Sequence, residues 1–420
     1  MKLFAEKNVP FLLCKSDRIL VFIMFFSYFF FYGLLNLNFF LEIPTGIPSG
    51  LMRLTTFGLA GFFVLKDFSN GEYPRMTASI ICLGVFLLYY FCVFVVDENV
   101  FGSNFDMSTG SSMQRGKLEV AYLFFISGLS YFLMFFAGRR RMAYVLANPS
   151  LVYIPSLLSV LIIIATNARA FGTLDLYQTY LYDFGDVRRA AIIAPVGTLI
   201  SVSPYLMFFS KNRLCNFFWG PLGCAAALMC VLISDSRSTI LAMLLVLVFY
   251  AFVSIRHVYS MVYALIVYIS GAVLFIPYLL MSAAFSRFMN IEKILDYDLV
   301  ESDQLSRIEL IKAGFSQFLD SPILGGHIYL IGGGYSHCTP ICILYSTGLI
   351  GFSLVLTCIA GVLKGMFAAV KIFREKIIWI CALGIFDVVG MLIHGDSMGI
   401  FCGSFAVFLM ANAFMSERCN

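Results

Sequence analysis

Long apolar runs, repeated along almost the whole chain, constrain its fold more than any other feature. Runs near residues 19–41, 77–96 and 338–362 each reach the roughly 20 residues that a helix needs to cross a bilayer. A helix in lipid pairs its own backbone groups, which makes a packed helix bundle the stable arrangement for such runs. The pattern therefore predicts an all-α polytopic integral membrane protein.

The composition agrees with that fold class. Charged residues make up 12% of the chain and hydrophobic residues 60%, whereas soluble domains carry about 25% charged residues. The mean hydropathy is +0.91. Basic residues that flank membrane helices account for the net charge of +4, so a nucleic-acid partner is not expected.

Short polar segments divide the chain into about 12 candidate membrane helices. The apolar runs lie near 19–41, 51–65, 77–96, 119–137, 151–166, 191–209, 216–233, 240–254, 261–281, 338–362, 377–393 and 399–415. The first run is too long for the core of a signal peptide and should remain as the first membrane helix. We expect one transmembrane domain over 1–420, with a large, partly helical periplasmic loop at 283–337.

Charge asymmetry between the loops predicts the orientation of the bundle. A majority of the 28 basic residues fall on one side, with the run 139–141 as the clearest marker, and most acidic residues fall on the other. Because Lys and Arg favour the cytoplasmic side, we expect both termini in the cytoplasm. The polar loops at 97–118, 167–190 and 283–336 then face outward.

Cysteine usage gives no sign of a metal centre or a disulfide framework. The 12 cysteines are scattered, mostly within apolar runs, and no CxxC pair occurs. Such residues are typical small packing groups of a membrane interior. We expect neither a metal nor a cofactor.

The largest loop contains a predicted amphipathic helix that carries Arg307. A proline at 322 ends this helix. Its apolar residues recur at helical spacing; these residues are Leu305, Ile308, Ile311, Phe315 and Phe318. Arg307 falls on the flank of this apolar stripe, where its fork could reach a site at the membrane surface. A surface arginine that merely snorkels to water remains an alternative.

The end of the same loop combines glycines with a histidine. The glycines at 325–326 and 332–334 could bring backbone amides to phosphate oxygens, or simply make the loop flexible. His337 stands where the loop becomes an apolar helix. There it could exchange a proton or donate to a phosphate, or serve only as a helix cap.

Three other outward loops supply further polar candidates. Arg237 precedes a helix so closely that its charge needs a partner or a wet cavity, and helix N-termini attract anions; Asp235 is a local partner. The remaining candidates could bind sugar or phosphate, although aromatic belts and polar turns have the same composition. They are Arg169, Arg188, Arg189, Tyr180, Tyr182, His394 and Asp396.

These elements together resemble the O-antigen polymerase and O-antigen ligase family. The resemblance covers roughly 230–355 and rests on the turn at 236–237, on Arg307 with its helix, on the segment 321–325, on the pair 336–337 and on glycines at 348 and 351. The resemblance implies that Arg237, Arg307 and His337 are the catalytic residues.

The resemblance implies a membrane glycosyltransferase of the bacterial inner membrane, with a periplasmic active site. Its substrate would be an oligosaccharide linked to undecaprenyl diphosphate in the membrane lipid. A polymerase joins such O-antigen or capsule repeat units, whereas a ligase transfers the glycan to lipid A–core. We favour a polymerase because Cys338 follows the histidine where ligases often have asparagine. A chain-length regulator protein is a candidate partner.

The chemistry implied by this family is metal-independent glycosyl transfer with inversion. Arginine forks can neutralise the leaving lipid diphosphate in place of a divalent metal. A third hypothesis is a lipid-linked oligosaccharide flippase or another transporter. Transporters place ionisable groups near the bilayer midplane, and Asp387 is nearly alone there, which argues against transport.

Overall fold

The structure is a computed structural model that describes residues 13–40, 47–72, 76–97, 132–138, 141–167, 185–234, 237–254, 307–328, 330–331, 336 and 338–394. All of its regular elements within these ranges are helices, which confirms the all-α prediction. The labelled helices are, in order, α1 (Lys15–Phe40), α2 (Ile47–Ser69), α3 (Ala78–Val96), α5 (Ser150–Asn167), α6 (Gly185–Phe209), η3 (Cys215–Trp219), α7 (Gly220–Ser234), α8 (Arg237–Ser254), α12 (Arg307–Asp320), α13 (Thr339–Phe373), η5 (Arg374–Ile377) and α14 (Ile378–His394). Residues 132–138 and 141–147 are helical as well.

The number of membrane spans is only partly comparable with the predicted 12. Within the described ranges, three helical stretches are long and apolar enough to cross a membrane: Lys15–Leu34, Ala78–Val96 and Thr339–Gly365. A fourth exists if the bent pair Arg141–Ala147 and Ser150–Thr166, with 67° between its halves, is one span. The predicted runs at 261–281 and 399–415 lie outside the described residues.

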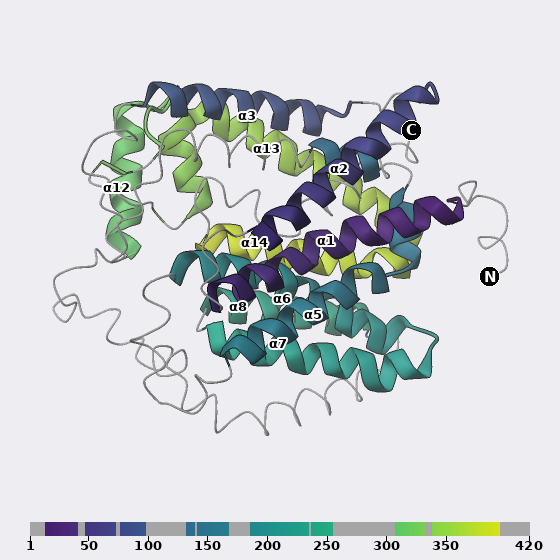
Figure 1. Cartoon of the computed structure of the whole chain (residues 1–420). Coiled ribbons are helices and arrows are strands. Elements are labelled where there is room, and N and C mark those ends of the chain that lie inside the picture. The colour runs from purple at the N-terminus through teal and green to yellow at the C-terminus, as the bar shows by residue number, and fades with distance from the viewer. Residues whose placement is uncertain are drawn as a thin grey trace.

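Most helices run roughly side by side across the molecule, whereas α12 stands crosswise to them (Figure 1). Helix α1 runs alongside α5, and small residues bring them close together. Ser159 donates to the carbonyl of Phe29 at 2.7 Å and accepts from the Gly33 amide at 3.2 Å. A Cβ on Gly33 would lie 2.8 Å from the Ser159 Cα, so this contact needs glycine.

Helices α6, α7, α8 and α14 form the neighbouring group. Gly223 packs against Ser203, and Gly220 against Met207, so α7 runs antiparallel to α6. Only two residues separate α7 from α8, which turns the chain back again. Helix α8 therefore runs in the same direction as α6.

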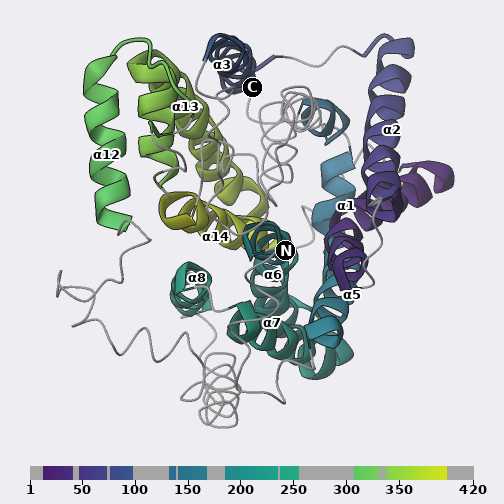
Figure 2. The same ribbon diagram turned by 60° about the vertical axis from the view of Figure 1, so that its left-hand side comes forward.

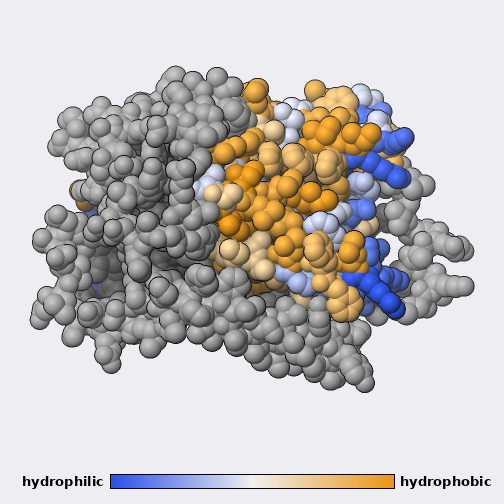
Figure 3. All heavy atoms as spheres, turned by 60° about the horizontal axis from the view of Figure 1, so that its bottom comes forward, coloured by the Kyte–Doolittle hydropathy of each residue, from blue (hydrophilic) through white to orange (hydrophobic). Residues whose placement is uncertain are grey.

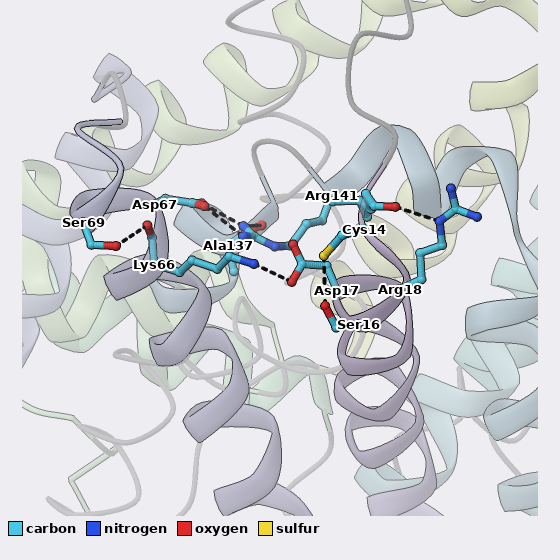
Figure 4. Close-up of polar contacts among 10 residues, drawn as sticks. Cys14, Ser16, Asp17, Arg18, Lys66, Asp67, Ser69, Ala137 and Arg141 are labelled. Atoms are coloured by element: carbon cyan, nitrogen blue, oxygen red, sulfur yellow. Dashed lines mark hydrogen bonds and ion pairs between the residues drawn. The ribbon is translucent and has the colours of Figure 1, made fainter.

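One end of the bundle, which we call the basic end, is defined by Arg18, Lys66 and Arg141 (Figure 4). The Arg141 side chain is 2% exposed and forms two hydrogen bonds with the Asp67 carboxylate, at 2.8 and 2.9 Å. Its guanidinium also lies 3.9 Å from the centre of the Phe63 ring. Lys66 pairs with Asp17 at 2.7 Å. A residue expected only to mark the cytoplasmic side is thus a buried structural group.

The surface has the polarity expected of a membrane bundle. Figure 3 shows apolar side chains over the middle of one face and hydrophilic side chains at the edge where α1 begins. Large apolar side chains are exposed on several helices, among them Leu88 of α3, Leu161 of α5 and Val248 of α8. Surfaces of this kind are stable against lipid tails.

Candidate functional site

Helix α13 is broken at Gly348, where the backbone has φ 62° and ψ −163°. The segment Ser321–Gly326, which follows α12, fills the break. The amide of Leu349 donates to the carbonyl of Pro322 at 2.9 Å, and the amide of Ile350 to that of Ile323 at 3.3 Å. The segment thus supplies acceptors that a continuous helix would have provided itself.

Two glycines make this contact sterically feasible. Gly325 and Gly348 both have positive φ, a conformation that costs other residues roughly 1–3 kcal/mol. A Cβ on Gly348 would overlap the carbonyl of Ile323, and a Cβ on Gly325 would overlap the backbone of Ser346. Each glycine therefore allows the backbone of the other segment to approach.

The amides of Gly325 and Gly326 are already engaged in this contact. They donate to the carbonyls of Ser321 at 2.9 Å and Tyr345 at 3.2 Å. The alternative that these two glycines cradle a phosphate is therefore wrong. The second glycine cluster, 332–334, lies outside the described residues.

Helix α12 packs on the part of α13 that precedes the break. Gly314 faces Ile341 and Tyr345, and a small apolar cluster of Leu330, Cys342 and Tyr345 with Leu310, Phe318 and Ile341 fills the contact. The Ile331 amide donates to Gln317 Oε1 at 2.9 Å. The predicted amphipathic helix is therefore present, and it ends at Asp320, just before Ser321 and Pro322.

The residue before His337 is held by side-chain contacts. Ser336, which directly precedes it, is fully buried. Its hydroxyl lies 3.1 Å from Cys342 Sγ and 3.2 Å from the carbonyl of Cys338. These contacts anchor the backbone next to His337, whose own placement lies outside the described residues.

A second anchor joins the same loop to α3. The buried Asp97, the C-cap of α3, accepts from the Ile328 amide at 2.7 Å and from His327 Nδ1 at 3.1 Å. Asp97 was not among the residues singled out from the sequence. Asp97 is separated from His327 and Ile328 by more than 200 positions, and no local pattern in the sequence predicts such a pairing.

Most predicted site residues are placed only through their helices. Arg237 is the first residue of α8, Arg307 the first of α12 and His394 the last of α14. Arg188 and Arg189 lie in the first two turns of α6. The structure does not describe the side chains of these five residues, and Arg169, Tyr180, Tyr182, His337 and Asp396 lie outside the described residues altogether.

The start of α8 and the start of α6 lie at nearly one height. The hydroxyl of Tyr250 on α8 donates to the carbonyl of Ser201 on α6, which fixes these residues side by side. Arg237 precedes Tyr250, and Arg189 precedes Ser201, by almost the same number of residues. Because the two helices run in the same direction, the two arginine backbones lie within about one helical turn in height.

The end of α14 reaches the same height from the opposite direction. Phe386 packs against Gly197, and Glu375, just before α14, lies near Tyr205, so α14 is antiparallel to α6. His394 lies as far beyond Phe386 as Arg189 lies before Gly197. We call this end of the bundle, which carries Arg189, Arg237 and His394, the loop end.

The break in α13, and with it α12, also belongs to the loop end. From Gly348, α13 runs to Phe373 and joins α14 through η5, near the opposite end of α6. The basic end lies there too. Arg141 shortly precedes α5, and Tyr153, close to the start of α5, donates to the carbonyl of Trp219. Trp219 directly precedes α7, whose start packs beside the end of α6. The predicted site positions and the basic cluster therefore occupy opposite ends.

Comparison with known proteins bears directly on this region. A family model described as O-antigen ligase matches residues 222–356, which include Arg237, Arg307, His337 and the break at Gly348. The search of curated proteins gives no significant match. The predicted extent of the resemblance, 230–355, lies within the matched residues. Residues 222–356 of this chain are therefore an O-antigen ligase family domain, of a family that includes both O-antigen polymerases and O-antigen ligases.

Proposed function

We propose that this protein polymerises undecaprenyl-diphosphate-linked oligosaccharide repeat units of O-antigen or capsule. The family domain at 222–356 supports activity on lipid-linked glycans. One observation supports the assignment of a site. The helix ends that bear Arg189, Arg237 and His394 lie at the loop end, together with α12, which begins at Arg307.

The proposed chemistry is a single displacement. A sugar hydroxyl of the acceptor attacks the anomeric carbon, and the bond to the lipid diphosphate breaks with inversion. Arg237 and Arg307 neutralise the charge that develops on the leaving diphosphate. His337 either removes the hydroxyl proton or donates to the diphosphate. The bonds that hold Ser336 and Ile328 keep the backbone before His337 in place.

The orientation of the site follows from charge. In the full sequence, most basic residues fall on the side that carries Arg18, Lys66 and Arg141, opposite the proposed site, and Lys and Arg favour the cytoplasmic side. We therefore assign the loop end to the periplasm, with both chain termini in the cytoplasm. Arginines at this height would meet diphosphate head groups at the surface of the inner membrane.

The alternative within the family is an O-antigen ligase, which the description of the matching family favours. Cys338 after the histidine supports the polymerase. A deletion strain distinguishes the two activities on a gel of lipopolysaccharide. Loss of a polymerase leaves single repeat units on lipid A–core, whereas loss of a ligase leaves none. The second pattern would refute the polymerase proposal.

A further inference from the structure

Helix α12 exposes an apolar ridge that no described element covers. Ile311, Phe315 and Leu319 are 38, 48 and 59% exposed. At about 100° per residue, positions spaced by four span only about 80° of the helix surface. In both ribbon views α12 stands at the periphery, with α13 beside it (Figure 2). The ridge is therefore a continuous stripe that faces away from the bundle.

The rest of α12 is divided as sharply. Gly314 and Gln317 are buried on the side that packs on α13. Lys312, Ser316 and Asp320, each one position after a ridge residue, are all exposed. The helix thus has a protein-facing side, an apolar exposed side and a polar exposed side. This is the pattern of a helix at an interface between lipid and water.

The ridge is continuous with the surface of a membrane-spanning helix. The segment after α12 exposes Ile323 and Leu324, and the Leu324 carbonyl accepts from the hydroxyl of Tyr89 on α3 at 2.6 Å. Next to Tyr89, Leu88 is 70% exposed. Because Ala78–Val96 is a candidate membrane span, its exposed apolar surface is expected to contact lipid tails.

Two contacts give the depth of this segment. Tyr89 lies seven residues before the end of α3, about 10 Å at 1.5 Å per residue. Independently, Gly361 of α13 packs against Ser79, which places the break at Gly348 about 20 Å from the start of α3. Helix α3 is about 28 Å long by the same rise. Both contacts therefore place Ser321–Gly326 within the length of α3, several ångströms from its loop-end terminus toward the membrane interior.

We propose that the ridge of Ile311, Phe315 and Leu319, with Ile323 and Leu324, rests among the acyl chains of the leaflet at the loop end. The irregular backbone of Ser321–Gly326 is compatible with that depth because other protein groups satisfy much of it. Helix α13 donates to the carbonyls of Pro322 and Ile323 and accepts from the Gly326 amide, and Tyr89 of α3 donates to the Leu324 carbonyl. Helix α12, which runs crosswise to α3 in Figure 1, then lies along the membrane surface with Lys312, Ser316 and Asp320 toward water.

This location does not depend on the glycosyl transfer proposed above. One consequence does rest on that proposal: an embedded α12 would hold Arg307, its first residue, at the height of lipid head groups. A ridge in lipid would thereby set the depth of this arginine relative to a diphosphate carried by the membrane.

The test replaces single residues of the full-length protein by photoreactive p-benzoylphenylalanine in native membranes. Phe315 is the probe position, and Ser316, the next residue on the polar side, is the matched control. After illumination, mass spectrometry should find several-fold more phospholipid adduct at position 315 than at 316. Equal yields, or crosslinks from 315 to another protein, would overturn the proposal. Chain extension by the unmodified protein tests the transferase assignment separately, so a failure of one proposal is distinguishable from a failure of the other.

Discussion

Asp97 holds His327 and the backbone beside it from the end of another helix. One carboxylate oxygen accepts from His327 Nδ1 at 3.1 Å, and the other from the Ile328 amide at 2.7 Å. Asp97 and Ile328 are both buried. The loop between α12 and α13 is therefore tied to α3 by a charge-assisted contact as well as to the break in α13.

Replacing Asp97 should destabilise the loop in a graded manner. Asp97→Ala leaves the buried Ile328 amide without its acceptor, at a cost of about 1–3 kcal/mol. Asp97→Asn keeps an acceptor oxygen and should cost less. A thermal melt read by a thiol-reactive dye suits this protein, because the thiols of Cys230 and Cys358 are buried and become reactive when the bundle unfolds. Equal melting temperatures for both variants would contradict this role.

The two glycines with positive φ should be far more sensitive than their neighbour. Gly348→Ala combines a strained backbone with overlap at Ile323, and we expect a loss of roughly 2 kcal/mol or more. Gly325→Ala should behave similarly. Gly326→Ala is the matched control, because a Cβ there has open space. The same thermal melt would contradict the account if Gly326→Ala were as damaging as Gly348→Ala.

The two ion pairs at the basic end should differ in strength. Arg141→Met strands the carboxylate of Asp67 in a buried site, and breaking such a pair costs about 3–5 kcal/mol. Lys66→Met should cost less, because the Lys66 side chain is 35% exposed and its ammonium interacts with Asp17 partly through water. Adding Asp67→Leu to Arg141→Met should restore much of the melting temperature. No restoration would mean that packing around Phe63, rather than charge, explains the loss.

The sequence predicted the positions of elements better than their contacts. The run at 77–96 corresponds to α3 at Ala78–Val96, because hydropathy alone determines where such a helix is stable. The break at Gly348 was not predicted within the run at 338–362, since an apolar run carries no information on φ. The segment 321–325, expected in an outer loop, instead contacts Tyr89 within α3.

Site residues were predictable only as chemical types. Arginines and histidines at loop edges stand out in an apolar chain, and the resemblance selected three of them. The pairing of Asp97 with His327 depends on the three-dimensional arrangement of α3 and α13, which no spacing in the sequence reveals. The burial of Arg141 was hidden for the same reason, because its partner lies on another helix.

The proposed catalytic arginines should not tolerate lysine. A lysine ammonium keeps the charge but loses the fork that binds two phosphate oxygens. Arg237→Lys and Arg307→Lys should each lower the rate of chain extension about 10²–10³-fold. Arg213→Lys is the control, because Arg213 is exposed near the start of α7, away from the proposed site. Normal rates in the first two variants would remove these residues from the mechanism.

The most direct test is chain extension by the purified full-length protein. It is incubated with labelled undecaprenyl-diphosphate-linked repeat units and a metal chelator, and the glycans are separated by length. We predict a ladder of products longer than one repeat, which His337→Ala and Arg307→Lys abolish. Products that require a divalent metal, or no extension by a folded protein supplied with its own repeat unit, would contradict a metal-independent polymerase.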